Sequence, residues 1–335
     1  MILRGGDRYQ GVMTMKKAAL SLALASLALA GCGSSSSSSA TSNSASNAAN
    51  TSSATAASTS SACPHNPVRF AVEPYDTGPT LEAAYKSLAS DLGAKLGCPV
   101  QLIISNTYVA EIDAMHAGQI EMGEFGPLGY VLAHQIADAQ PVAAFGDTNG
   151  QPDTYTAGIW VPKNSPITSL KQLKGKTLAL SSTTSTSGGL YPISALISAG
   201  FKCSPTSCQG VTIKFAGSHT ASLLALTHGT TDAAEVNSQQ QASATKAHQF
   251  NAADYREIWK STNIINDPIT VAGSLPAAFQ AKVKAALLGL TAKQVSTVDT
   301  ELGTDSNGPM VPATDALYNQ VRDVAKTVHL TTSDL

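Results

Sequence analysis

The segment Ser185-Thr186-Ser187-Gly188 has the residue types that hold an anion. It lies between a strand-like run, 177–180, and a helical pattern that begins at Gly189. A helix N-terminus carries unsatisfied N–H groups and a partial positive charge, so three hydroxyls there would join several backbone donors around one point. Each charge-assisted hydrogen bond contributes about 1.5–3 kcal/mol. The segment therefore predicts an anion site, and the alternative is a Ser/Thr-rich cap that only begins the helix.

A second segment of this kind is Gly217-Ser218-His219. Ser218 is a predicted N-cap, which places His219 in the first turn of the following helix. A neutral imidazole donates one N–H to an oxyanion and can become cationic once the anion is bound. The alternative is a surface histidine beside a cap.

The elements that position both segments form an α/β pattern, in which strand-like runs alternate with helical ones from Val68 onward. Ligands of open α/β sheets lie beyond the carboxyl ends of the strands, where both hydroxyl-rich segments fall. Strands are predicted at 68–72, 100–104, 120–125, 157–161, 177–180, 211–215 and 269–272, and helices at 80–96, 109–117, 127–139, 169–173, 189–199, 218–227, 275–288 and 314–327.

The N-terminal part of the 335-residue chain predicts export. Lys16-Lys17 precede an apolar run that ends in Leu29-Ala30-Gly31-Cys32, which is typical of a secretory signal at 15–31 and too short to span a bilayer comfortably. Leu-Ala-Gly-Cys resembles the bacterial lipobox, so Cys32 is predicted to be acylated; a plain signal peptide is the alternative. Residues 1–14 are interpreted as a start-site artefact, because Met15 begins a more ordinary signal.

Residues 32–62 follow as a tether composed almost entirely of Ser, Ala, Thr and Asn. Such a segment buries too little apolar area to fold, and about 30 residues of flexible coil reach on the order of 30 Å. Only 13% of the chain is charged and the net charge is −2, which argues against a nucleic-acid partner.

The four remaining cysteines are predicted to form two structural disulfides, since export permits them. Four cysteines allow three pairings. Cys203–Cys208 would close a small loop, and Cys63–Cys98 would staple the start of the domain. A zinc site is the alternative, but the sequence shows no Cys-x-x-Cys or matching His spacing.

From Val68 to about Leu302 the chain resembles the phosphate/phosphite/phosphonate-binding family of ABC-transporter receptors. Single motifs are weak, but the ordered set is specific. It consists of Tyr108, His116-Ala117-Gly118, Phe125-Gly126-Pro127-Leu128-Gly129-Tyr130, Ser165-Pro166-Ile167, Leu173-Lys174-Gly175-Lys176, Ser185-Thr186-Ser187-Gly188, Gly217-Ser218-His219, Gly229 with Asp232-Ala233-Ala234, Ile258-Trp259-Lys260-Ser261 and Asn266-Asp267-Pro268.

The resemblance implies a two-lobed periplasmic-binding-protein type II fold, each lobe a mixed sheet flanked by helices, with ligand in the cleft. Lobe one would use 66–154 plus 266–335 and lobe two 155–265, with crossovers near Tyr155 and Ile265. It also implies a monomeric extracytoplasmic receptor, lipid-anchored to the cell membrane, whose closed form docks on a permease, with no cofactor, metal or catalytic residue. The phosphorus oxygens would be held by Ser185, Thr186, Ser187 and His219, with Tyr108 and Asp267 completing the pocket.

Two positions depart from the family pattern and bear on the ligand. Binders of aminophosphonates are expected to place a carboxylate where this chain has Gln239, and some carry tyrosine where it has Phe125. A neutral Gln239 cannot neutralise a buried ammonium, so phosphite, a simple alkylphosphonate or phosphate is favoured. Asp267 beside an anion suggests that a protonated ligand oxygen donates to its carboxylate.

Two other classes of function compete with the receptor. Ser187, His219 and Asp267 are the residue types of a hydrolytic triad. Against this, the sequence contains no G-x-S-x-G elbow, phosphate-loop lysine or dinucleotide glycine motif. A surface lipoprotein that binds another solute would suit the tether equally, but it leaves the hydroxyl-rich helix starts without a purpose. The sequence therefore predicts a binding protein and not an enzyme.

Overall fold

The computed structural model describes residues 63–76, 78–304 and 307–334, all within one folded unit. The segments 1–14 and 15–31, the acylated Cys32 and the tether 32–62 lie outside the described residues, so these predictions are not tested. None of the described helices is both long and apolar enough to cross a membrane.

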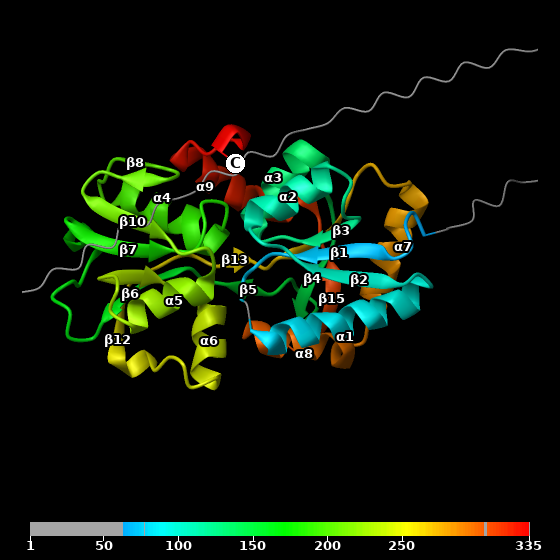
Figure 1. Cartoon of the computed structure of the whole chain (residues 1–335), viewed down its shortest axis with the longest axis horizontal. Coiled ribbons are helices and arrows are strands. Elements are labelled where there is room, and N and C mark those ends of the chain that lie inside the picture. The colour runs from blue at the N-terminus through cyan, green and yellow to red at the C-terminus, as the bar shows by residue number, and fades with distance from the viewer. Residues whose placement is uncertain (1–62, 77, 305–306, 335) are drawn as a thin grey trace, which may run out of the picture. The chain divides into compact units, whose positions relative to one another are not determined.

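One half of the described chain is a six-stranded sheet with the order β15-β4-β14-β3-β1-β2, called lobe 1 with the helices packed on it. Strand β1 is parallel to β2 and β3, whereas β14 is antiparallel to β3 and β4. In Figure 1, α1 and α8 lie on one side of this sheet, and α2 and α3 lie on the other. The elements are β1 (Val68–Val72), α1 (Pro79–Leu96), β2 (Val100–Ile104), α2 (Tyr108–His116), β3 (Met122–Glu124), α3 (Pro127–Ala137), β4 (Gln140–Asp147), β14 (Pro268–Val271), α7 (Ala277–Leu288), α8 (Ala292–Leu302) and β15 (Asn307–Pro312).

The other half is a seven-stranded sheet with the order β12-β6-β11-β7-β10-β9-β8, called lobe 2 with its helices. Its central strands β10, β7 and β11 are parallel, and β6 runs antiparallel to β11 and β12. The elements are β6 (Gly158–Pro162), β7 (Lys176–Leu180), α4 (Tyr191–Ser198), β8 (Cys203–Ser204), β9 (Ser207–Cys208), β10 (Val211–Phe215), α5 (His219–Thr227), β11 (Ala233–Glu235), α6 (Ser238–Lys246) and β12 (Tyr255–Lys260).

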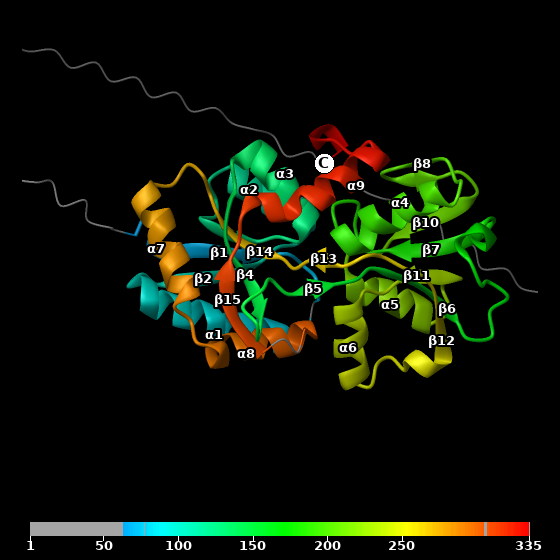
Figure 2. The same ribbon diagram turned by 180° about the vertical axis from the view of Figure 1, so that it is seen from behind.

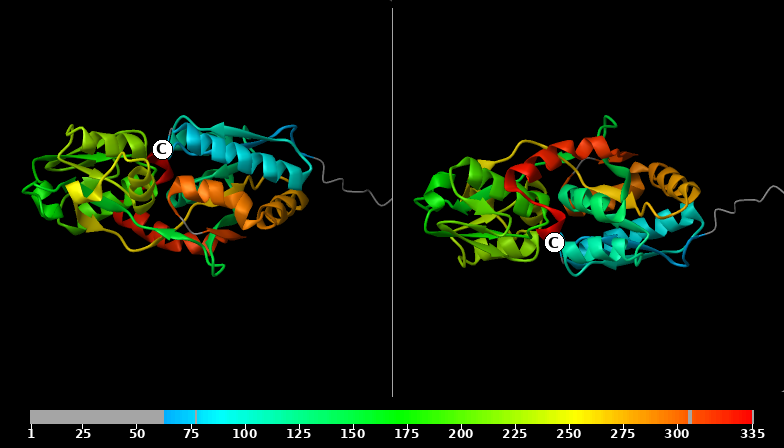
Figure 3. Two further views of the ribbon diagram at one scale, coloured as in Figure 1. Left: turned by 90° about the horizontal axis from the view of Figure 1, so that it is seen from below. Right: turned by 90° about the horizontal axis from the view of Figure 1, so that it is seen from above.

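The chain passes between the lobes at two short strands, β5 (Thr154–Tyr155) and β13 (Ile264–Ile265), which pair antiparallel (Figure 2). The C-terminal helix α9 (Asn319–Val328) packs against α3 in lobe 1 and α4 in lobe 2 (Figure 3). A hydrogen bond of 3.1 Å between the hydroxyls of Ser194 and Thr327 links α4 to α9. Two mixed sheets flanked by helices confirm the predicted fold class.

Helix α1 illustrates how the sequence builds the core of lobe 1. Its buried residues recur at helical spacing and include Leu81, Leu88 and Leu92. Pro79 occupies the first turn, where its missing N–H costs nothing, and Gly97 ends the helix with a φ of 62°, a conformation that favours glycine. The apolar face packs against β2 and the helices α7 and α8.

Both predicted disulfides are confirmed. Cys63 and Cys98 are joined with their Cα atoms 5.8 Å apart, which ties the start of β1 to the end of α1. Cys203 and Cys208 are joined with their Cα atoms 4.0 Å apart, across the hairpin of β8 and β9.

Candidate ligand-binding site

A small cavity of about 10 Å³ is lined by residues of both lobes. That volume is far below the range typical of pockets for drug-sized ligands, so only a compact ligand is compatible with the cavity. The cavity brings together six of the eight predicted ligand-binding residues. It is lined by Glu73, Tyr75, Gly126, Tyr155, Ser185, Thr186, Ser187, His219, Asn237, Gln239 and Asp267.

The hydroxyl-rich loop forms the start of a π-helical turn, Thr186–Leu190, which continues directly into α4. The helix was predicted to begin only at Gly189. Ser185 is the N-cap, and its Oγ accepts a hydrogen bond of 3.2 Å from the Gly188 N–H. A Cβ atom on Gly189 would lie 2.0 Å from the Ser182 carbonyl oxygen, so only glycine permits this close approach. The loop is therefore folded tightly, with Ser185 and Ser187 buried against the cavity.

Thr186 connects this loop to the opposite lobe. Its Oγ1 accepts a hydrogen bond of 2.8 Å from the Leu128 N–H in the first turn of α3. Nearby, the Thr220 hydroxyl donates to Asp76 Oδ1 at 2.7 Å. Both bonds join lobe 2 to lobe 1 beside the cavity, so the structure corresponds to a conformation in which the lobes are in contact.

His219 is the first residue of α5 and is held on both ring nitrogens. Its Nδ1 lies 2.9 Å from a carboxylate oxygen of Glu235, at the end of β11, and its Nε2 lies 3.2 Å from Ser185 Oγ. Glu235 is completely buried, and a buried carboxylate needs a partner of this kind. A proton on Nδ1 directed to Glu235 leaves Nε2 for the cavity, where a second proton would serve an oxyanion.

Two carboxyl groups line the cavity, one of which, Glu73, was not predicted. Glu73 follows β1, and its Oε2 accepts a hydrogen bond of 2.7 Å from the Gly126 N–H at the start of α3. Burial, reinforced by the charge of Asp267, raises the pKa of Glu73 well above its usual range. Burial likewise raises the pKa of Asp267 to about 7. Among the described residues, the lining contains neither lysine nor arginine.

Amide side chains complete the polar lining. Asn237, the N-cap of α6, donates from Nδ2 to Ser187 Oγ at 3.2 Å. Gln239 donates from Nε2 to Asn266 Oδ1 at 3.3 Å. Asn237 was not predicted, but like Glu73 it follows the carboxyl end of a strand, and that rule applied to every strand would have found both.

Tyr108 and Phe125 lie outside the cavity lining, and their role in binding stays a prediction. Tyr108 is buried at the first position of α2, beside Ser185 of the cavity lining. Phe125 is buried with its ring against Gly123, where a Cβ would lie 2.5 Å from the ring.

The arrangement of ionisable groups differs from the triad considered as the alternative. Ser187 Oγ bonds to Asn237, whereas the imidazole of His219 contacts Ser185 and Glu235. Within residues 63–76, 78–304 and 307–334, no group of three or more His, Cys, Asp or Glu residues could hold a metal ion.

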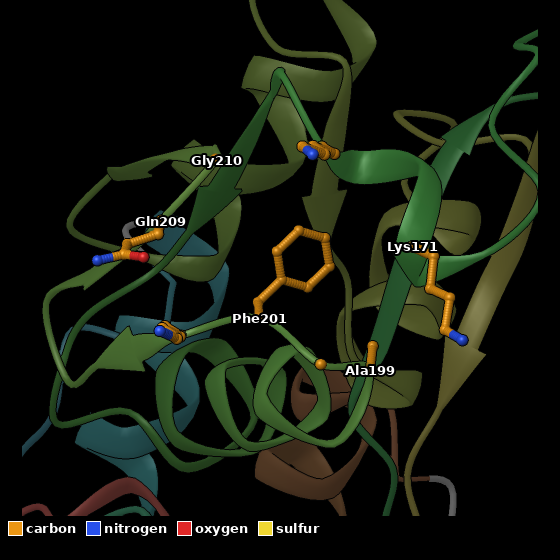
Figure 4. A pocket seen from close by; sticks show the side chains of 8 residues that line it. Lys171, Ala199, Phe201, Gln209 and Gly210 are labelled. Atoms are coloured by element: carbon orange, nitrogen blue, oxygen red, sulfur yellow. The ribbon is translucent and has the colours of Figure 1, made fainter.

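A second hollow, an open groove in lobe 2, differs from the cavity in the burial of its polar groups. Figure 4 shows the ring of Phe201 in its centre, with the labelled side chain of Lys171 beside it. Its charged residues, Lys171, Lys174 and Lys202, are exposed, so no buried donors converge there. The cavity between the lobes is therefore the candidate site.

Comparisons with known proteins identify the family to which the chain is similar. A model of the family described as "ABC transporter, phosphonate, periplasmic substrate-binding protein" matches residues 70–318. The chain is 27% identical over 270 residues to the phosphate-import protein PhnD of Mycolicibacterium smegmatis, and the match covers 77% of this chain and 84% of that protein.

Solved structures agree on the fold. PhnD1 from Prochlorococcus marinus, in complex with methylphosphonate, superposes with a TM-score of 0.68 at 20% identity, covering 79% of this chain and 98% of that one. A binding protein of an ABC phosphonate transporter from Pseudomonas aeruginosa gives a TM-score of 0.67 at 19% identity, covering 79% and 87%.

The family model, which matches most of the folded part of the chain, confirms the resemblance predicted from the ordered motifs. Family membership implies a location outside the cytoplasm, a small ligand and a permease as partner. The chain belongs to the periplasmic substrate-binding proteins of phosphonate ABC transporters.

Proposed function

We propose that the cavity receives a compact phosphorus oxyanion, either phosphite, a simple alkylphosphonate or phosphate, for delivery to the permease. The observation that carries this proposal is the convergence of Ser185, Ser187 and His219 on one small cavity at the starts of two helical segments. Hydroxyl, imidazole and helix N–H groups are the donors that tetrahedral oxyanions require. The relatives agree, since one is a phosphate-import protein and another was solved with methylphosphonate.

The size and chemistry of the cavity favour the smaller ligands of this class. Gln239 lies in the lining as a neutral amide engaged with Asn266, so it offers no charge to an ammonium group. Asp267 is the proposed acceptor for a protonated ligand oxygen. A ligand with one P–OH group would then satisfy donors on one side and an acceptor on the other.

Delivery of the ligand to the permease requires a protein that is held at the membrane and whose lobes close on the ligand. We propose that acylated Cys32 holds the protein at the membrane through the tether 32–62 and that the protein acts as a monomer. Ligand would favour the closed state through contacts made to both lobes there. Mass spectrometry of the mature protein should find a diacylglyceryl group on Cys32, and a Cys32→Ala variant should appear in the medium instead of the membrane fraction.

Calorimetry tests the ligand proposal. The purified protein is titrated with phosphite, methylphosphonate, phosphate, 2-aminoethylphosphonate and sulfate. We expect tight binding of at least one of the first three and its loss in Ser187→Ala and His219→Ala. Unchanged affinity in both variants, or no binding of any phosphorus oxyanion, would refute the proposal.

A hydrolytic role is the second candidate, because Ser185 Oγ, His219 and Glu235 form a hydrogen-bonded series. A serine, histidine and carboxylate in contact are the parts of a nucleophilic site. Ser185 Oγ is, however, also committed to the Gly188 N–H as a cap. We expect no turnover of nitrophenyl phosphate or acetate esters; turnover that is abolished in Ser185→Ala would favour the enzyme.

A further inference from the structure

The cavity proposed for an anion is acidic. His219 is matched by Glu235 behind it, which leaves Glu73 and Asp267 as the other ionisable carboxyl groups of the lining. If both were ionised, two negative charges would face the ligand with no lysine or arginine in the lining to offset them. Like charges at such short range in a buried site repel strongly. An oxyanion can therefore enter only if at least one of these groups holds a proton, unless the ligand itself brings a positive charge.

The two oxygens of Glu73 have different surroundings. Oε2 accepts the Gly126 N–H at 2.7 Å, at the start of α3. Oε1 has no hydrogen-bond partner among the described residues, and Glu73 lines both the cavity and a second pocket beside Asp76 and Leu81. The residue is only 7% exposed. A carboxylic acid in this position would accept from the backbone with one oxygen and carry its proton on the other, which is available to a ligand.

The acids nearest Glu73 favour its neutral form: Asp267 before β14 and Glu124 on β3 raise its pKa, and Glu73 in turn raises that of Glu111 on α2. The other titratable neighbours are the phenols Tyr85 on α1, Tyr108 on α2 and Tyr155 on β5, and the base among the described residues of the cavity lining is His219 of lobe 2. Among the residues that the structure describes, the Gly126 N–H is the group that stabilises the carboxylate. Both oxygens of Glu111 and Oε2 of Glu124 are buried without a hydrogen-bond partner in the described residues, and the other oxygen of Glu124 accepts from the Tyr85 hydroxyl at 2.7 Å.

We propose that Glu73 is a specificity residue that binds the ligand as a neutral acid, donating a hydrogen bond from Oε1 to an oxygen of the oxyanion. This inference rests on the proposed function and extends it to the protonation state. With Glu73 as donor and Asp267 as acceptor, the preferred ligand is a phosphorus oxyanion that keeps one P–OH group. When Glu73 is ionised it repels the ligand, so above its pKa in the unbound protein each ligand brings one proton from solvent onto the carboxylate.

The test compares wild type with Glu73→Gln, which keeps the size of the side chain and an N–H donor but never ionises. Affinity for methylphosphonate and phosphate is measured by calorimetry from pH 6 to pH 9, in buffers of different ionisation enthalpy that count the protons taken up. The titration of the ligand occurs in both proteins, so the difference between them reports the loss of the Glu73 charge. As the pH rises above the pKa of Glu73, the Kd of wild type should increase relative to that of the variant. The increase can reach about tenfold per pH unit, which is the maximum when binding takes up one proton.

Further variants keep the outcome decisive. Glu73→Leu fills the same space but has no hydrogen-bond donor. It should therefore bind the ligand more weakly than Glu73→Gln at every pH. Glu82→Gln, an exposed acid of α1 that pairs with Lys86, should follow wild type throughout.

Two results would overturn the inference while leaving the proposed function intact. One is an identical pH slope and proton count in wild type and Glu73→Gln, with normal binding in both. The other is a preference of wild type for 2-aminoethylphosphonate over methylphosphonate that disappears in Glu73→Gln, because Glu73 would then be an ionised partner of an ammonium group. Failure of wild type to bind any phosphorus oxyanion at any pH would instead overturn the proposed function and the inference with it.

Discussion

The two lobes present opposite chemistry to the cavity. Lobe 2 contributes hydroxyls and the imidazole of His219, whereas lobe 1 contributes the carboxyl of Glu73, with Asp267 at the start of β14. The contrast extends to the composition of the two lobes. Lobe 2, residues 155–265, contains nine Lys or Arg residues and four Asp or Glu residues. Lobe 1, residues 66–154 with 266–335, contains eight Lys or Arg residues and eighteen Asp or Glu residues. Complementarity to an anion therefore depends here on where protons reside and not on a cluster of positive charge.

The largest effect should come from removing the imidazole on the lobe 2 side. His219→Ala deletes a donor to the ligand and leaves Glu235 buried without its partner. We expect affinity for the phosphorus oxyanion to fall about 10- to 100-fold, as for one charge-assisted hydrogen bond. Calorimetry measures the affinity and thermal melting the stability, which should also fall because an unpaired buried charge is costly.

A double variant separates these two effects. His219→Ala with Glu235→Gln removes the stranded charge, so stability should recover while affinity stays low. Recovery of affinity in the double variant would show that His219 serves only to neutralise Glu235.

On the lobe 1 side, Asp267→Asn should change the pH dependence of stability. Burial raises the pKa of this group from 3.8 to about 7, so the folded protein binds its proton more tightly than the unfolded chain does. The contribution of Asp267 to stability is therefore complete below about pH 4 and is lost as pH rises toward about pH 7. Melting temperatures of the unliganded protein across this window should decline less in Asp267→Asn than in wild type; parallel curves would contradict the assignment.

A smaller effect is expected where the lobes meet. Thr186→Val removes the acceptor of the Leu128 N–H but keeps the shape of the side chain. A neutral hydrogen bond contributes about 0.5–1.5 kcal/mol, so ligand affinity should fall about two- to tenfold through a less favourable closed state. Thr186→Ser keeps the acceptor and serves as the control; an equal loss in both variants would point to a direct role of the methyl group.

The site residues that the sequence predicted are those whose placement is local. Ser185 caps Gly188 three residues on, and Ser218 caps Ala221 in the same manner, so the type and spacing of these side chains already define the helix starts. Glu73 directly follows the predicted strand 68–72, so its position was accessible to prediction, but its partner Gly126 lies 53 residues away. Only the parallel pairing of β1 with β3 brings the two together, and no local pattern encodes it.

The same distinction separates the elements that were predicted from those that were not. Helix α1 has apolar residues at regular helical spacing, and its predicted bounds differ from the observed ones by one residue. Helix α6, with the sequence SQQQASATK, has almost no apolar residue and was not predicted. It is held by the Asn237 cap and by burial of Ala244 against the core of lobe 2, which are tertiary effects.

The two disulfides allow the stability of the lobes to be compared with the smallest expected effect on binding, because neither disulfide lines the cavity. Cys63–Cys98 closes 35 residues in lobe 1, and Cys203–Cys208 closes only 5 at the edge of lobe 2. Loop-closure entropy grows with loop length, so replacing the first pair by serines should cost about 3–4 kcal/mol of unfolding free energy and replacing the second pair less. Denaturant titration of the two double-serine variants measures this order, and calorimetry should find ligand affinity unchanged in both. A loss of affinity in the lobe 2 variant would mean that the β8–β9 hairpin supports the hydroxyl-rich loop through α4, which contacts β8.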